Sequence, residues 1–132
     1  MSIYLTGASG FVGKNLISYF KNKIEIKKHV RDSEFLIKEN TVIHLAGKAH
    51  DLKNIANPQS YYDANTSLTI NLFDKFIASN AEVFIYMSSV KAVADELNTE
   101  LFEDFTPKPV TDYGKSKLYA EQYILSKSIS KC

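Results

Sequence analysis

Short apolar runs alternate along this chain with segments whose apolar residues recur at helical spacing. Apolar runs rich in β-branched and aromatic residues are typical of strands, and helical spacing is typical of one buried helix face. The pattern predicts strands at residues 2–5, 25–30, 41–45 and 83–87 and helices at 10–20, 60–79 and 111–128. We also expect a single helical turn at 35–39, and burial of both faces of the strand at 83–87.

This alternation predicts an α/β fold, a Rossmann-like, doubly wound parallel sheet with helices on both faces. Only residues 31–40 separate the second strand from Thr41. A parallel crossover needs about a dozen residues or more. One strand of the usual set is therefore expected to be missing or reduced at this point. The length of 132 residues allows one domain, spanning 1–132.

Composition and charge exclude several classes of protein. Hydrophobic residues make up 45% of the chain, which suits a globular core, and a net charge of +1 indicates neither a nucleic-acid nor a membrane-surface partner. No apolar run approaches the roughly 20 residues of a membrane span. The single cysteine, Cys132, can form no internal disulfide, and no signal peptide is visible, so we expect the cytoplasm. No spacing of histidines or cysteines suggests a metal site.

Gly7, Gly10 and Gly13 lie between the first predicted strand and the first predicted helix. In a dinucleotide-binding turn the first glycine allows a tight turn, the second lets backbone N–H groups approach a pyrophosphate, and the third lets the helix pack close to the sheet. The free N–H groups of the helix N-terminus also favour phosphate. The predicted cofactor contacts of this turn are Gly7, Ser9, Gly10, Phe11, Val12 and Gly13.

Two further groups of polar residues could carry chemistry. Tyr113 and Lys117 lie four residues apart in the last predicted helix and so share one face. A nearby ammonium group favours the phenolate, which would let a tyrosine exchange a proton with an alcohol or carbonyl; the alternative is an ordinary surface pair. Ser88 and Ser89 end a strand where ligands of open α/β sheets bind, although both hydroxyls could simply satisfy local backbone groups.

Taken in order, these motifs resemble the extended short-chain dehydrogenase/reductase superfamily, and within it the NAD-dependent epimerase/dehydratase family, which includes nucleotide-sugar epimerases, dehydratases and 4-ketoreductases. The similarity spans nearly the whole chain and is especially close over residues 113–121. The matching residues are Gly7, Gly10, Gly13, His44–Gly47, Asn65, Ser88–Lys91, Tyr113 and Lys117.

The resemblance implies catalytic roles for Tyr113, Lys117 and Ser89. Tyr113 would be the general acid/base, Lys117 would assist it and hold the nicotinamide ribose, and Ser89 would hydrogen-bond the substrate oxygen. Ser89 is preferred to Ser88 because the segment 89–95 aligns with the family's Ser-x-x-Val-Tyr-Gly-Asp, although its Tyr-Gly is replaced here by Val-Ala.

The resemblance also implies further contacts with an NAD or NADP cofactor. Leu45, Ala46 and Gly47 would lie against it, and Asn65 would be either a structural group near the site or a plain helix cap. An acidic residue after the second strand binds the ribose 2′-hydroxyl of NAD, whereas a nearby arginine accommodates the 2′-phosphate of NADP. Arg31 therefore favours NADP, and Asp32 leaves NAD open. His44 is expected to pack at the strand end rather than bind a ligand.

The implied activity is hydride transfer at C4 of a nucleotide-linked sugar, in the synthesis of polysaccharide precursors. Val90 and Lys91 stand where many dehydratases carry a glutamate, which counts against a dehydratase. The family's later strands and substrate domain have no counterpart here, so we expect a truncated, cofactor-binding half whose open sheet edge causes marginal stability or homo-oligomerisation. The alternatives are a non-catalytic dinucleotide-binding module or another Rossmann enzyme, such as a methyltransferase, against which Ser89 and the tyrosine–lysine pair argue.

Overall fold

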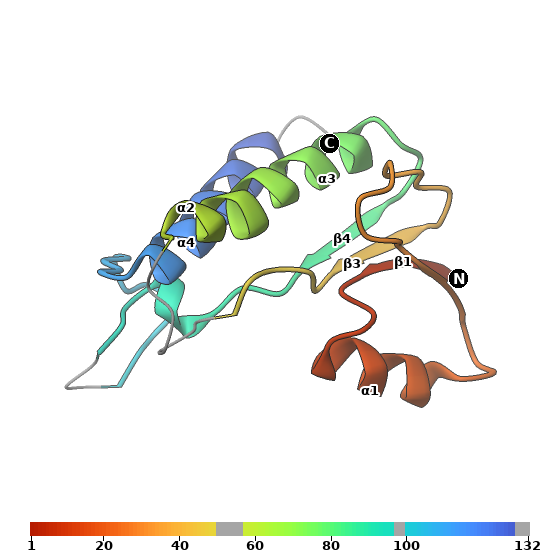
Figure 1. Cartoon of the computed structure of the whole chain (residues 1–132), viewed down its shortest axis with the longest axis horizontal. Coiled ribbons are helices and arrows are strands. Elements are labelled where there is room, and N and C mark those ends of the chain that lie inside the picture. Colours follow the sequence, from red (N-terminus) through yellow and green to blue (C-terminus); the bar gives the residue numbers. More distant parts are fainter. Residues whose placement is uncertain (50–56, 97–99, 129–132) are drawn as a thin grey trace. The chain divides into compact units, whose positions relative to one another are not determined.

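A computed structural model describes residues 1–49, 57–96 and 100–128 of the chain (Figure 1). These residues form two compact units, one from residues 1–47 and 71–87 and the other from the described parts of 48–70 and 88–132. The elements are β1 (Ser2–Thr6), α1 (Phe11–Phe20), β2 (Glu25–Lys28), β3 (Thr41–His44), α2 (Gln59–Tyr61), the π-helix η1 (Tyr62–Ser67), α3 (Leu68–Ile77), β4 (Val83–Tyr86), the 3-10 turn η2 (Val90–Ala92) and α4 (Asp112–Ser128).

The first unit is built on a sheet of 4 strands in the order β2-β1-β3-β4. Every neighbouring pair is parallel, and Leu5 of β1 lies opposite Lys28 of β2 and Ile43 of β3. The predicted parallel, Rossmann-like sheet is therefore confirmed. Residues 29–40 pass from β2 to β3 without forming a strand, so the expected shortening of the sheet is confirmed as well.

The helical turn expected at 35–39 is wrong, because these residues have no regular secondary structure. Phe35 is buried, and its ring lies 4.5 Å from the ring of His29. The neighbouring Leu36 is 62% exposed. Phe35 therefore anchors this segment beside the residue that follows β2, and the segment has no second turn that would sustain helical hydrogen bonds.

Helices cover both faces of the sheet within this unit (Figure 1). On one face Ile3, Leu5 and Ile43 form a buried cluster, against which Leu16 and Ile17 of α1 pack. On the other face Phe84 of β4 contacts two phenylalanines of α3, Phe73 at 4.9 Å and Phe76 at 5.1 Å between ring centroids.

Strand β4 is not buried on both faces, so that expectation is wrong. Val83, Ile85 and Met87 are each 46% exposed. They lie on the face where α1 packs over β1 and β3, and β4 is the edge strand of the described sheet. A continuous apolar run indicates a strand that needs cover, but it does not say whether the cover lies within the same stretch of chain.

The second unit contains α2, η1, the start of α3, η2 and α4. The helix predicted at 60–79 is helical from Gln59 to Ile77, but its segment Tyr62–Ser67 winds as a π-helix. η1 packs directly against α4. α4 runs from Asp112 to Ser128, one residue inside the predicted start, and its first turn packs against η2.

Candidate active site

The glycine turn of the first unit is shaped by close backbone contacts at two of its glycines. Gly7 has φ +71°, and a Cβ there would lie 2.6 Å from the backbone N of Ala46. A Cβ at Gly13 would lie 2.3 Å from the carbonyl oxygen of Gly7. Both approaches exclude any side chain, so the fold itself requires glycine for the tight turn and for the packing of α1 on it.

Gly10 differs, because the protein's own contacts do not require a glycine there. Among the described residues beyond its chain neighbours, the one atom that a Cβ at Gly10 would meet within 4 Å is the Gly7 carbonyl oxygen, at 3.3 Å, and the φ of −73° suits any residue. Gly10 precedes α1, whose first turn has neither a side-chain cap nor an acidic residue. The space beside Gly10 and the uncapped N–H groups of α1 fit a diphosphate, which is the group that the sequence predicts here.

The loop that follows β3 is held by a residue that the sequence analysis did not single out. The hydroxyl of Thr6 accepts a hydrogen bond from the Ala46 N–H at 3.2 Å, and it lies 2.6 Å from Nδ1 of His44. Thr6 and His44 are both fully buried. His44 therefore packs at the strand end, as expected, and Thr6 fixes the backbone of the predicted cofactor contacts Leu45–Gly47. Only the β1–β3 register, which pairs Thr6 with His44, reveals this role.

Arg31 and Asp32 lie in an exposed turn just after β2. The turn is closed by hydrogen bonds from the N–H and hydroxyl of Ser33 to the carbonyl oxygen of Val30, at 3.2 and 2.7 Å. Asp32 adopts φ 62°, a left-handed conformation that aspartate tolerates. Both candidate ribose contacts thus follow the carboxyl end of the strand next to β1, where cofactor selectivity is set in dinucleotide-binding sheets.

In the second unit, Lys117 lies one helical turn after Tyr113 on α4 and is only 6% exposed. Burial lowers the pKa of Lys117 to about 8, against the opposing effect of the Glu121 charge. Tyr113 is half-buried, and its ring meets that of Tyr61 edge-on at 6.0 Å. The alternative of an ordinary surface pair is wrong for Lys117, because a lysine on a surface keeps its ammonium group in water.

Asn65 ties this part of α4 to the start of the second unit. Its Oδ1 accepts from the Lys48 N–H at 2.8 Å, and its Nδ2 donates to the Lys48 carbonyl and to Oγ of Ser116, both at 3.1 Å. Thr66 donates to the Ser116 carbonyl at 2.8 Å. Asn65 is completely buried within η1, so it is not a helix cap. Two successive residues of the π-helix, Asn65 and Thr66, thus both hold Ser116, the residue that precedes Lys117.

Ser89 is half-buried and caps the turn η2, since its Oγ accepts a hydrogen bond from the Lys91 N–H at 3.2 Å. Ser89 thus satisfies a local backbone group, which is the alternative role that the sequence leaves open for the serine pair. The Ser89 hydroxyl can still donate its own hydrogen. Ser88 Oγ is buried and has no hydrogen-bond partner among the described residues.

The glycine turn, Arg31 and the Leu45–Gly47 loop thus belong to the first unit, and Ser89, Tyr113 and Lys117 belong to the second. Within residues 1–49, 57–96 and 100–128, no group of histidine, cysteine, aspartate and glutamate side chains could hold a metal ion. No helix in these ranges is long and apolar enough to cross a membrane. Cys132 lies outside the described residues.

Comparison with known proteins shows to which family this chain belongs. The model of the NAD dependent epimerase/dehydratase family matches residues 31–128. The chain belongs to this family. It is 31% identical over 152 residues to the UDP-glucose 4-epimerase of Vibrio cholerae, a match that covers 95% of this chain and 46% of that protein. Matches to curated relatives of this kind cover between about a third and a half of their length.

Solved structures of similar proteins support the same fold. MoeE5 in complex with UDP-glucose and NAD is 24% identical, with a TM-score of 0.85, and the match covers 96% of this chain and 48% of MoeE5. RMD from Pseudomonas aeruginosa, complexed with NADPH, is also 24% identical, with a TM-score of 0.79 over 98% of this chain and 50% of RMD. At this level of identity the two structures establish the Rossmann-like fold.

Proposed function

We propose that this chain is the cofactor-binding half of an NAD(P)-dependent oxidoreductase or epimerase that transfers hydride at C4 of a nucleotide-linked sugar. The first unit binds the dinucleotide through the glycine turn and the loop Leu45–Gly47. The second unit supplies the groups that move and hold protons: Ser89, Tyr113 and Lys117. The role in polysaccharide-precursor synthesis that the sequence predicts belongs to this proposal.

The observation that carries the proposal is the burial of Lys117 one helical turn from Tyr113. Burying an ammonium group costs folding free energy, and ordinary helices leave their lysines in solvent. The burial holds the pKa of Lys117 near 8, so the group is still largely protonated at neutral pH. A buried cation one helical turn from a half-buried phenol is an arrangement suited to general acid–base catalysis.

Family relatives narrow the substrate class. The Vibrio cholerae relative is a UDP-glucose 4-epimerase, and an Aggregatibacter actinomycetemcomitans relative of 31% identity is a GDP-6-deoxy-D-talose 4-dehydrogenase. Both act at position 4 of a sugar carried on a nucleoside diphosphate. MoeE5 binds NAD and RMD binds NADPH. Arg31 supports NADP for this chain, and Asp32 supports NAD.

Each residue has a distinct task in the proposed reaction. A nicotinamide held by the residues above would supply the hydride acceptor and donor. Tyr113 takes the proton from the sugar hydroxyl as the carbonyl forms, and returns it when the carbonyl is reduced. The Ser89 hydroxyl donates a hydrogen bond to the same oxygen. Lys117 donates to the ribose hydroxyls and stabilises negative charge on the phenol oxygen.

The substitution Tyr113→Phe tests the assignment. We expect it to abolish conversion of UDP-glucose to UDP-galactose by the natural, full-length protein, because phenylalanine has no hydroxyl to carry the proton. NADH and NADPH affinities should stay within a few-fold of wild type, since the ring is kept. Chromatography of the sugar nucleotides measures turnover, and nicotinamide fluorescence measures cofactor affinity. Equal turnover by the variant would rule out the role of Tyr113, and a wild-type protein that binds cofactor but turns over no nucleotide sugar would favour the non-catalytic module.

A further inference from the structure

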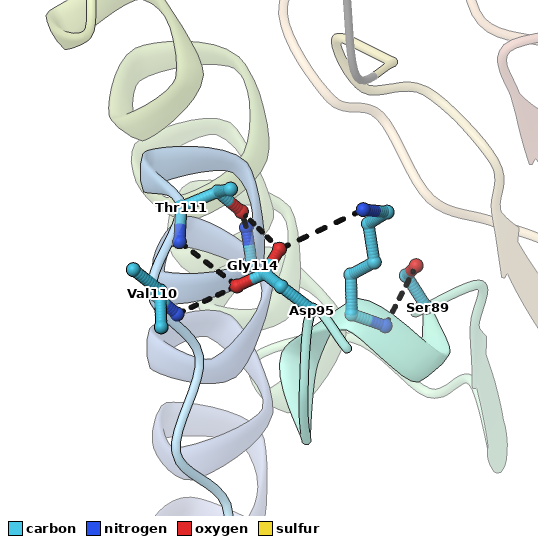
Figure 2. Close-up of polar contacts among 6 residues, drawn as sticks. Ser89, Asp95, Val110, Thr111 and Gly114 are labelled. Atoms are coloured by element: carbon cyan, nitrogen blue, oxygen red, sulfur yellow. Dashed lines mark hydrogen bonds and ion pairs between the residues drawn. The ribbon is translucent and has the colours of Figure 1, made fainter. Parts of the chain in front are cut away.

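The carboxylate of Asp95 holds the segment that begins α4. Oδ2 accepts hydrogen bonds from the backbone N–H groups of Val110, at 2.6 Å, and Thr111, at 2.9 Å. Oδ1 accepts from the hydroxyl of Thr111 at 2.7 Å. Figure 2 shows these contacts converging on one side chain, which is only 11% exposed. Asp95 thus fixes both the backbone and the rotamer of Thr111.

Thr111 in turn caps α4. Its Oγ1 accepts a hydrogen bond from the N–H of Gly114 at 3.1 Å, the pattern of a helix N-cap (Figure 2). Tyr113 lies between these two residues, and Lys117 follows one turn later. The Asp95–Thr111 and Thr111–Gly114 hydrogen bonds thus hold the first turn of α4, which carries Tyr113.

The same carboxylate lies at the end of the turn that carries Ser89. Ser89 caps η2 through the Lys91 N–H, and the ammonium group of Lys91 lies 3.7 Å from Oδ1 of Asp95. The backbone of this turn also touches α4, because a Cβ at Gly114 would lie only 2.3 Å from the Lys91 carbonyl oxygen. The hydrogen bonds, the ion pair and the Gly114 contact therefore close a ring between η2 and the start of α4.

We propose that Asp95 is a positioning residue that clamps the Ser89 turn to the first turn of α4, and so fixes the Ser89 hydroxyl relative to the Tyr113 phenol. The proposal rests on the proposed function, in which both groups meet one substrate oxygen. Asp95 itself touches no reacting atom. Its effect is to keep the two donors in one geometry, which is a condition for rapid proton transfer.

The environment of Asp95 suits a clamp that stays ionised. Burial raises the pKa of this carboxyl, but the hydrogen bonds from Thr111 and Val110 and the charge of Lys91 outweigh that effect, and the pKa lies below its usual range. A carboxylate that accepts several hydrogen bonds is held more rigidly than a neutral group in the same place. Two conservative substitutions that keep polar groups serve as controls, Asp95→Asn and Thr111→Ser.

The test compares Asp95→Ala with Asp95→Asn, and Thr111→Val with Thr111→Ser. The asparagine oxygen can accept from both backbone N–H groups while its amide donates to Thr111, and serine keeps the capping hydroxyl. We expect the alanine and valine variants to lower kcat by up to about 100-fold, as misplaced catalytic groups do. KM for UDP-glucose and NADPH affinity should stay within about twofold. Thr111→Ser should recover most of kcat, and Asp95→Asn, which keeps the hydrogen bonds but loses the ion pair with Lys91, should recover part of it.

Amide hydrogen exchange provides a readout that does not need turnover. In the alanine and valine variants the Gly114 N–H should exchange about tenfold faster than in wild type, because Asp95→Ala frees the rotamer of its acceptor, Thr111, and Thr111→Val removes the acceptor oxygen. Exchange near Ile124, further along α4, serves as the internal control for loss of the whole helix. An equal rise at both positions would mean unfolding and would overturn the clamp.

The two proposals fail in different ways. If wild-type protein converts no nucleotide sugar but Gly114 exchange follows the expected order of variants, the proposed function fails. The Asp95 contacts are then structural only, and the positioning role of Asp95 is overturned with the function. If wild type is active and Asp95→Ala retains kcat and Gly114 exchange within twofold, the clamp is wrong while the function stands. A fall in kcat that Asp95→Asn and Thr111→Ser both rescue supports it.

Discussion

At the scale of single residues, the site contains two positions where any side chain would destabilise the fold and one position where a buried charge does so. Gly7 and Gly13 have no room for a Cβ, and Lys117 is buried on α4. The two glycines stabilise the turn, whereas Lys117 reduces stability and is retained for another reason. Residues that violate local rules in this way are expected at functional sites.

Substituting the glycines one at a time separates folding from cofactor binding. Gly10→Ala should change the free energy of unfolding by less than about 1 kcal/mol, because its φ suits alanine and the nearest atom that a Cβ would meet, the Gly7 carbonyl oxygen, lies 3.3 Å away and needs to shift only slightly. It should weaken NADPH binding by about tenfold or more, since the methyl group occupies the diphosphate approach.

Gly13→Ala is the matched control for that prediction. Its Cβ would press on the Gly7 carbonyl, so we expect a loss of about 1–3 kcal/mol of stability. Urea unfolding measures the stability of both variants, and nicotinamide fluorescence measures binding. Equal binding by Gly10→Ala and wild type would contradict the assignment of this turn to the phosphates.

Replacing Lys117 by methionine should stabilise the protein at neutral pH while abolishing turnover. Burial lowers the pKa of Lys117 from its ordinary value of 10.5 to about 8. Below about pH 8 the lysine is protonated in both the folded and the unfolded states, and folding has to bury the charge. This costs on the order of 3 kcal/mol, which methionine would remove.

The sign of the pH dependence checks this argument. Between about 8 and 10.5 the unfolded chain holds the proton on Lys117 and the folded chain does not, so the Lys117 contribution to stability rises with pH. The advantage of Lys117→Met should therefore shrink across that range. Denaturant unfolding at several pH values measures it, and a stability difference that does not change with pH would contradict the burial of a charged Lys117.

At the scale of elements, strand β4 is the least complete part of the described sheet. Val83 and Ile85 of β4, together with Met87 just after it, leave an apolar stripe exposed, and the open backbone of an edge strand can pair with another chain. We expect the 132-residue chain to associate, and Ile85→Lys to reduce this association. Tyr19→Lys places the same charge on an exposed apolar residue of α1 and is the control. Sedimentation velocity measures the outcome; a wild-type chain that is monomeric and melts cooperatively at high temperature would contradict the expectation.

The elements were largely predictable, because their signals are local. The strands, α1, α4 and the glycine turn follow from hydrophobic spacing and from a motif of adjacent residues. The contacts that organise the second unit were not predictable, since they join residues far apart in sequence. Asp95 meets Thr111 across 16 positions and Asn65 meets Ser116 across 51. The exposure of β4 was missed for a related reason, because an apolar run does not reveal what covers it.

At the scale of the whole molecule, the chain has two compact units with different tasks in the proposed reaction. The first carries the glycine turn and the residues that would select NAD or NADP, and the second carries the groups that would move a proton. That residues 1–132 act as one incomplete dinucleotide-binding domain in the cytoplasm stays a prediction. Family membership is established, and it makes cofactor binding the property on which every other proposal for this chain depends.

The most direct test of that property is titration of the purified chain with NADPH and with NADH, followed by nicotinamide fluorescence. The account predicts saturable binding of a nicotinamide dinucleotide, tighter for NADPH because Arg31 can pair with the 2′-phosphate. Arg31→Ala should then remove the preference and leave NADH binding unchanged. If neither nucleotide binds saturably, the glycine turn does not hold a dinucleotide, and the proposed function is wrong for this chain.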